Sequence, residues 1–262
     1  MNLGLKEKVV LVTASSRGLG KAIATEYARE GARVMIAARN EDELKKTADE
    51  IFSLTGSEVD YCVTDVSNRL DIDNLFERTI NRFGKLDVLI TSAGGPPGGT
   101  FNDFEDEVWE QVFQTNLLSV VRLIRGAIPH LRAAGGGRII NIASTSVKQP
   151  IEGLLLSNTF RAGILGLSKS ISIEFAPENI LINTVAPGRI DTDRTRHLDQ
   201  LKAELTEKTV EEIQIQSKKN IPLGRYGTPQ EFAKTVVFLG SEANSYVTGQ
   251  ALLIDGGMVR AL

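Results

Sequence analysis

Gly18 and Gly20 follow an apolar run at residues 9–12 and open a stretch with helical periodicity. Glycine lets the backbone approach a ligand, and the first amides of a helix offer an anion both hydrogen-bond donors and a favourable dipole. A strand, a glycine turn and a helix in this order are typical of a diphosphate site. A tight turn that binds nothing is the alternative. We expect a dinucleotide along Thr13, Ser15, Ser16, Arg17, Gly18, Leu19 and Gly20.

The end of the second apolar run bears on which dinucleotide binds. Proteins that bind NAD usually place an acid there to hold the ribose 2′-hydroxyl, and an acid would repel a 2′-phosphate. This chain has Ala38 followed by Arg39, and arginine pairs with phosphate through two parallel hydrogen bonds. With Arg17 as a second cation, we expect NADP(H) to be preferred and NAD(H) to be the alternative. Taken alone, Arg39 would be read as a solvated residue at a helix start.

Short apolar runs alternate with helical patterns along the chain, and such alternation must position these residues. The expected helices cover 20–30, 68–83, 103–131, 153–176 and 229–240, with another starting at Asn40, where Glu43 completes a capping box. The expected strands are 9–12, 34–37, 59–63, 88–90, 139–142, 182–185 and 252–254. The pattern predicts an α/β Rossmann fold, a doubly wound, seven-stranded parallel sheet in three layers with strand order 3-2-1-4-5-6-7.

We expect one domain over residues 1–262, because no linker, repeat or low-complexity tract interrupts the chain. One segment departs from the alternation: residues 189–223 are charged and helix-prone and precede the last strand–helix unit. An insertion at the carboxyl edge of a parallel sheet is well placed to cover a substrate. We therefore expect a substrate lid at about 189–223.

The composition excludes several other classes of protein. Hydrophobic residues make up 42% and charged residues 24% of the chain, which is ordinary for a globular protein. A net charge of −3 without a basic cluster argues against nucleic acid as a partner, and no apolar run suits a membrane span. Cys62, His130 and His197 are too scattered for a zinc site. Without a signal-peptide pattern, a cytoplasmic protein is expected.

The ordered motifs resemble those of the short-chain dehydrogenase/reductase family over essentially the whole length. Ala14 stands where the family's phosphate loop has its first glycine, and Asn116 matches the helix asparagine of its catalytic tetrad. Further matches are Asp65 and Val66 at the adenine, Ser92, Ala93 and Gly94 in the turn after strand four, Pro187, Gly188, Ile190 and Thr192 at the nicotinamide, and the segments 248–250 and 255–257. The branch of 3-oxoacyl-acyl-carrier-protein reductases is the most similar in texture and shares the type of segment at 221–225.

The resemblance also shows a departure at the catalytic positions. Ser144 matches the serine that polarises the carbonyl in the family. Ser157 and Arg161 occupy the positions of the family's proton-donating tyrosine and of the lysine that lowers its pKa and holds the ribose. The chain has no tyrosine between Cys62 and Arg225, so no shift of register restores one.

The replacements still make geometric sense. Ser157 and Arg161 are four residues apart and share one helix face. Arg161 offers a fixed fork of hydrogen-bond donors to ribose hydroxyls. It stays cationic, so it supplies positive electrostatic potential but no proton. Ser157 is a far weaker acid than tyrosine, whose unperturbed pKa is about 10.

Three interpretations remain open. In the first, hydride transfer persists, and the proton comes from water held by Ser144, Ser157 and Asn116, or from His197. In the second, Arg161 or Arg189 recognises an anionic substrate. In the third, the protein is a catalytically weak or inactive dinucleotide-binding sensor or scaffold.

We favour an enzyme that reduces a small-molecule carbonyl, 3-oxoacyl-like or another small ketone, to an alcohol. The resemblance alone implies a homotetramer or homodimer formed through the helices at 103–131 and 153–176.

Overall fold

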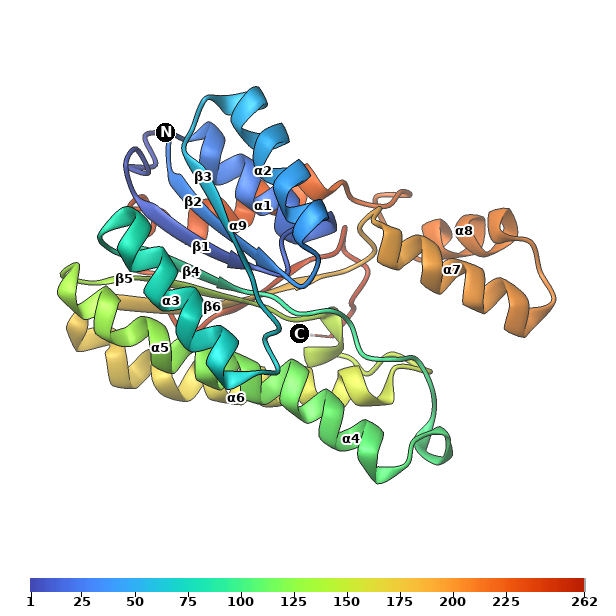
Figure 1. The fold of residues 1–262 in the computed structure, drawn as a ribbon. Helices are drawn as coiled ribbons and strands as arrows, with labels where there is room; N and C mark the ends of the chain where they lie inside the picture. The colour runs from blue at the N-terminus through green and yellow to red at the C-terminus, as the bar shows by residue number, and fades with distance from the viewer. Residues whose placement is uncertain (262) are drawn as a thin grey trace.

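The computed structural model describes residues 1–261 and contains one parallel sheet in the order β3-β2-β1-β4-β5-β6-β7 (Figure 1). This order confirms the expected Rossmann topology. The winding reverses between β1 and β4, which pair directly although β2 and β3 lie between them in the sequence. The strands are β1 Val9–Thr13, β2 Arg33–Ala38, β3 Val59–Val63, β4 Val88–Thr91, β5 Gly137–Ile142, β6 Ile180–Pro187 and β7 Ala251–Ile254.

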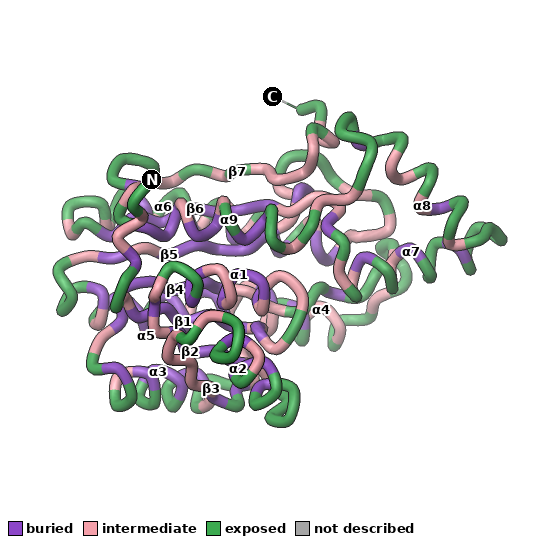
Figure 2. The backbone as a smooth tube through the Cα atoms, turned by 90° about the horizontal axis from the view of Figure 1, so that it is seen from above, coloured by how far each residue is buried: buried purple, intermediate pink, exposed green. Residues whose placement is uncertain are grey.

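Two hydrophobic clusters on opposite faces of the sheet give the three expected layers. Within β1, Val10 and Val12 face one cluster and Val9 and Leu11 face the other, as the two-residue period of a strand requires. The central strand β1 is therefore apolar on both sides and buried, as Figure 2 shows for the centre of the molecule, whereas the edge strands β3 and β7 are more exposed. The first cluster lies under α1 Gly18–Arg29, α2 Glu41–Thr55 and α9 Pro229–Leu239, and the second under α3 Arg69–Phe83, α5 Ser119–Ala133 and α6 Leu155–Phe175.

The helix expected at 103–131 is interrupted, and there the prediction was wrong. A short 3-10 turn, Phe101–Asp103, precedes α4 Asp106–Phe113, and a π-helical turn, Gln114–Leu118, separates α4 from α5. A π turn inserts one extra residue into a helix, and such turns often lie at functional sites. Here it contains Asn116, whose Nδ2 donates a 2.8 Å hydrogen bond to the carbonyl of Gly94 in the loop after β4. Sequence periodicity does not register a single added residue.

The insertion forms two helices, α7 Asp193–Thr206 and α8 Val210–Lys219, between β6 and α9. In Figure 1 they project from the body of the molecule on the side toward which α4 also extends. Asp199 anchors them, because its buried carboxylate accepts a 2.7 Å hydrogen bond from Arg189 and a 2.9 Å hydrogen bond from Tyr226. No helix within residues 1–261 has both the length and the apolar character needed to cross a bilayer.

Candidate active site

The residues singled out from the sequence lie along one edge of the sheet, where the strands end. They occupy the loops that follow β1 to β6, together with the π turn and the start of α6. The carboxyl ends of parallel strands share one edge, and ligands bind there where the winding reverses. The residues brought to this edge are Thr13 to Gly20, Arg39, Asp65, Val66, Ser92 to Gly94, Asn116, Ser144, Ser157, Arg161, Pro187, Gly188, Ile190 and Thr192.

The amino terminus of α1 is open toward this edge. Arg17 is its N-cap residue but makes no capping hydrogen bond, and the first turn contains no acid. Within residues 1–261, the amides of Gly18, Leu19 and Gly20 have no hydrogen-bond acceptor. Helix α2 differs, because Asn40 caps it and acids fill its first turn. Free amides at a helix start can bind a phosphate group, so this loop fits the diphosphate of a dinucleotide.

Two glycines shape this loop for different reasons. A β-carbon on Gly20 would lie 2.3 Å from the carbonyl oxygen of Ala14, so only glycine lets the helix pack against the loop. Gly18 has φ +58°, a left-handed conformation, but a β-carbon there would meet only Thr192, at 4.0 Å. Ala14 has φ 50° and so carries a β-carbon in a conformation that favours glycine.

The hydroxyls of Thr13 and Ser15 make hydrogen bonds to the backbone of the protein itself. The hydroxyl of Thr13 donates to the carbonyl of Ser92 at 2.7 Å and accepts from its amide at 2.8 Å, which joins the ends of β1 and β4. The hydroxyl of Ser15 donates to the Val12 carbonyl at 2.7 Å and accepts from the Ala37 amide at 3.0 Å. Both side chains are fully buried, so they hold the loop in shape rather than face a ligand.

The corner where β2 and β3 end holds Arg39 together with two acids, Asp65 and Glu43. Arg39 is exposed, and its charge reaches Asp65. Burial raises the pKa of Asp65, but hydrogen bonds from Ser67 and the charge of Arg39 outweigh it and hold the pKa below its ordinary value. The expected capping box is only half present: Asn40 accepts from the amide of Glu43, but the Glu43 carboxylate accepts from Ser16 instead.

Several residues of the expected nucleotide set also have structural roles. Ile190 is buried in the hydrophobic cluster on one face of the sheet, and Leu19 packs against that cluster. Val66 packs against the cluster on the opposite face. Gly188 lies so close to Asp255 that a β-carbon would approach its side chain to 2.5 Å. Thr192 caps α7 through its hydroxyl.

Ser144 follows β5 directly. It caps the 3-10 turn Thr145–Val147, and its hydroxyl accepts a 3.2 Å hydrogen bond from the amide of Ser146. In the described part of the chain its proton has no acceptor, so it is available to a carbonyl oxygen. Ser144 is partly exposed, as a group that contacts substrate must be.

Ser157 and Arg161 lie on one face of α6 and are 8% and 6% exposed. The Nη1 of Arg161 donates a 2.7 Å hydrogen bond to the carbonyl of Ile142, the last residue of β5. This bond places the guanidinium beside the strand end that leads to Ser144. Burial and then the charge of Arg194 lower the pKa of Arg161 to about 10, so it is cationic at neutral pH.

The insertion contributes a cation other than the one expected. Arg189 is neutralised by Asp199 and is not available to an anionic substrate. Arg194 reaches the site instead: its Nη2 donates a 2.6 Å hydrogen bond to the carbonyl of Pro96 in the loop after β4. No sequence pattern distinguished the two arginines, because the difference lies in a tertiary contact. His197 is exposed on α7.

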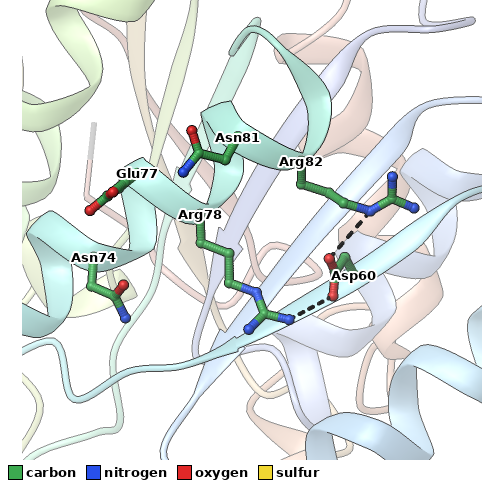
Figure 3. Close-up of a pocket in the computed structure, with 6 residues that line it drawn as sticks. All are labelled: Asp60, Asn74, Glu77, Arg78, Asn81 and Arg82. Atoms are coloured by element: carbon green, nitrogen blue, oxygen red, sulfur yellow. Dashed lines mark hydrogen bonds and ion pairs between the residues drawn. The ribbon is translucent and has the colours of Figure 1, made fainter.

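A hollow elsewhere is lined by β3 and α3 (Figure 3). Its charges satisfy one another: Asp60 lies 3.1 Å from Arg78 and 3.4 Å from Arg82. Asp60 is near the amino end of β3, away from the carboxyl edge. The hollow is therefore a surface ion-pair network and not a rival active site.

The chain is similar to known reductases over nearly its whole length. Residues 13–259 match a family model described as enoyl-(acyl carrier protein) reductase. The 3-oxoacyl-(acyl-carrier-protein) reductase FabG of Chlamydia muridarum is 37% identical over 259 residues, which cover 98% of this chain and 100% of that protein.

Solved structures agree over the whole fold. L-sorbose reductase from Gluconobacter frateurii, complexed with NADPH and L-sorbose, is 32% identical with a TM-score of 0.95, and the match covers 100% of both chains. An NADPH-bound short chain oxidoreductase from Pseudomonas aeruginosa PAO1, described as containing an atypical catalytic center, is 28% identical with a TM-score of 0.90 over 99% of both chains. The open phosphate loop, the sheet topology and these full-length matches agree: the chain belongs to the short-chain dehydrogenase/reductase family of oxidoreductases.

Proposed function

We propose that the protein is an NADP(H)-dependent oxidoreductase that reduces the carbonyl group of a small molecule to an alcohol through an atypical active site. The observation that carries this proposal is the hydrogen bond from Arg161 to the carbonyl of Ile142. It places a buried cation next to the strand end that presents Ser144. Similarity to ketone-reducing relatives and to NADPH-bound structures supports the reaction class and the cofactor.

The cofactor site would use three parts of the carboxyl edge. The free amides of Gly18 to Gly20 would hold the diphosphate, and Asp65 would contact the adenine. Arg39 and Arg17 would pair with a 2′-phosphate, which favours NADP(H) over NAD(H). Glu43 lies at the same corner through its bond with Ser16 and would oppose that preference in part. The backbone of Ser92 to Gly94 and Thr192 would line the nicotinamide half.

The side chains of the protein would prepare the carbonyl for reduction. When bound, the nicotinamide ring supplies the hydride. Ser144 would donate a hydrogen bond from its free hydroxyl to the carbonyl oxygen and so stabilise the negative charge that develops there. Arg161 would orient the ribose and add positive potential. Asn116 holds the loop after β4 through Gly94, so it would position residues as well as water.

The proton that completes the alcohol needs a source other than tyrosine. Serine is too weak an acid to release one readily, so Ser157 would hold a water molecule together with Ser144 and Asn116. His197 remains the alternative donor, but it is exposed on α7 and would have to move with the insertion. In this proposal residues 189–223 serve as the substrate lid of a single-domain enzyme. We also propose that the protein forms a homotetramer or homodimer through the helices near 103–131 and 153–176.

A direct test combines binding with turnover. The protein would be titrated with NADPH and NADH by calorimetry, then given NADPH with a panel of ketones while the absorbance of the reduced nicotinamide is followed. Tight NADPH binding with oxidation by at least one ketone supports the proposal. NADPH binding without turnover on any ketone would favour a sensor, and silence toward both nucleotides would overturn the dinucleotide site itself.

A further inference from the structure

Two of the arginines at the candidate site, Arg161 and Arg194, are buried or half-buried and have no acidic partner within residues 1–261. Other arginines in and next to the insertion are paired. Arg189 binds Asp199, Arg196 binds Asp191 and Asp193, and Arg225 binds Glu231. Both unpaired cations lie at the strand edge and, unlike Arg17 and Arg39, are not exposed to solvent, which calls for an explanation.

Arg161 is almost completely buried yet makes one hydrogen bond, to the neutral carbonyl of Ile142. A guanidinium has five N–H donors, so most of its capacity is unused. Its remaining nitrogens are not among the sealed polar atoms without a partner in the described chain. They therefore keep some accessible surface, through which a ligand can reach them.

Arg194 is half-buried and likewise binds only a neutral carbonyl, that of Pro96, at 2.6 Å. Its guanidinium lies against the backbone of Gly95, where a β-carbon would come within 3.0 Å of its Nε. The glycine thus leaves room for the arginine over the loop after β4.

The two cations destabilise each other as the protein stands. Burial lowers the pKa of Arg194, and burial followed by the charge of Arg194 lowers the pKa of Arg161. Buried charges are normally paired, because leaving water without a partner of opposite sign is costly. An anion between the two guanidinium groups would offset both the desolvation cost and the repulsion.

We propose that the substrate is a free oxo acid, whose carboxylate lies between Arg161 and Arg194 while its carbonyl lies against Ser144. This inference rests on the proposed function and narrows its substrate class. In the reaction, the oxo acid gains a hydride at carbon and a proton at oxygen to become a hydroxy acid, and NADPH becomes NADP⁺. A neutral ketone or ester would leave the two cations unpaired.

The phosphates of the cofactor are the other anions that could meet these arginines. The fold favours the substrate, because Arg161 binds the end of β5 and Arg194 binds the loop after β4. The phosphate loop follows β1, on the other side of β4 in the sheet. Arg161 therefore lies beside β5 and away from β1. Arg194 is two residues from Thr192, which approaches Gly18, so the affinity for NADPH must be measured to separate the two anions.

The test compares acids with their methyl esters in the wild type, Arg194→Gln and the control Arg196→Gln. Arg196 lies on the same helix but is exposed and already paired. Calorimetry would measure binding of acetoacetate, pyruvate and their methyl esters, with and without NADP⁺, and a separate titration would give the Kd of NADPH. We expect the wild type to prefer the acids, and Arg194→Gln to weaken acid binding roughly 10- to 100-fold. Ester binding and the Kd of NADPH should change less than about twofold, and Arg196→Gln should match the wild type.

Equal binding of acid and ester by the wild type, or no binding of either acid, would overturn the inference. So would an Arg194→Gln variant that loses affinity for NADPH rather than for acids, since the arginine would then serve the cofactor phosphates. A failure of the proposed function looks different: the wild type would not bind NADPH, while acid binding to the unliganded protein would still report on the arginine pair.

Discussion

The guanidinium of Arg161 is tied to the backbone carbonyl of Ile142, two residues before Ser144. This bond joins α6 to the end of β5, so the two elements that carry the candidate catalytic groups form one unit. A lysine amine would be a compact charge on a flexible stem, whereas the planar guanidinium can bind the carbonyl with one donor and a ligand with the others. If Arg161 occupies the lysine position that the resemblance implies, it therefore adds a structural tie and keeps the cation.

The pH dependence of reduction should reflect the absence of a tyrosine acid. Arg161 has a folded-state pKa of about 10, lowered by burial and then by Arg194, the charged group that faces it from α7. It remains protonated below that value and loses its charge above it. We expect kcat/KM for ketone reduction to be flat between about pH 6 and 9 and to fall toward pH 10. A loss of turnover in His197→Gln would instead identify the histidine as the proton donor.

Ser144→Ala should lower kcat without weakening the cofactor. The hydroxyl is the free donor at the end of β5, and removing one donor to a developing oxyanion costs about 100-fold in rate. Calorimetry should give an unchanged Kd for NADPH, since the phosphate loop lies at β1. Ser146→Ala is the matched control: its hydroxyl is buried without a partner, so turnover should persist. Equal loss in both variants would indicate damage to the 3-10 turn rather than loss of a catalytic donor.

The sheet and its functional edge could be predicted from the sequence because they follow from local patterns. The order of β1 to β7 results from alternating strands and helices, and Gly18 and Gly20 mark the candidate phosphate loop by their position between a strand and a helix. Side-chain partners could not be predicted, since they depend on tertiary distances. The hydroxyl of Ser15 accepts a hydrogen bond from β2, and the carboxylate of Glu43 accepts one from Ser16. Arg189 rather than Arg194 forms the ion pair with Asp199.

Arg39→Gln should weaken NADPH binding and leave NADH binding almost unchanged. The exposed guanidinium lies at the corner where a 2′-phosphate would lie, and losing it should raise the Kd of NADPH about tenfold. Arg29→Gln, at the far end of α1, is the control and should affect neither nucleotide. Glu43→Gln should have the opposite effect to Arg39→Gln, because it removes a negative charge from the same corner. A parallel loss of NADH affinity in Arg39→Gln would show that the arginine does not select the phosphate.

The double substitution Ser157→Tyr and Arg161→Lys should accelerate reduction of a neutral ketone. It restores an acid and its partner four residues apart on α6, and general acid catalysis can contribute roughly 100-fold. The larger ring must fit a site where Ser157 is only 8% exposed, so circular dichroism and thermal unfolding must first establish correct folding. The single change Arg161→Lys is the control and should not increase the rate. A well-folded double variant without gain would show that the pocket no longer presents a carbonyl to residue 157.

The phosphate loop offers a stability test that needs no ligand. Ala14 and Gly18 both adopt left-handed conformations, with φ of 50° and +58°. A β-carbon disfavours this conformation by roughly 1 kcal/mol, and Gly18 has open space around the position of a β-carbon, so sterics within the residue dominate. We expect Ala14→Gly to raise the free energy of unfolding by about 0.5–1 kcal/mol, because relief of strain exceeds the added entropy of the unfolded chain.

Gly18→Ala is the matched opposite and should lower the free energy of unfolding by about 1 kcal/mol. Urea denaturation of both variants beside the wild type gives the two differences under one set of conditions. If Ala14→Gly were neutral while Gly18→Ala destabilised, the backbone at Ala14 would have to be relaxed in solution. The loop would then lack the left-handed conformation at Ala14, and the amides at the start of α1 would not be preorganised to bind a diphosphate.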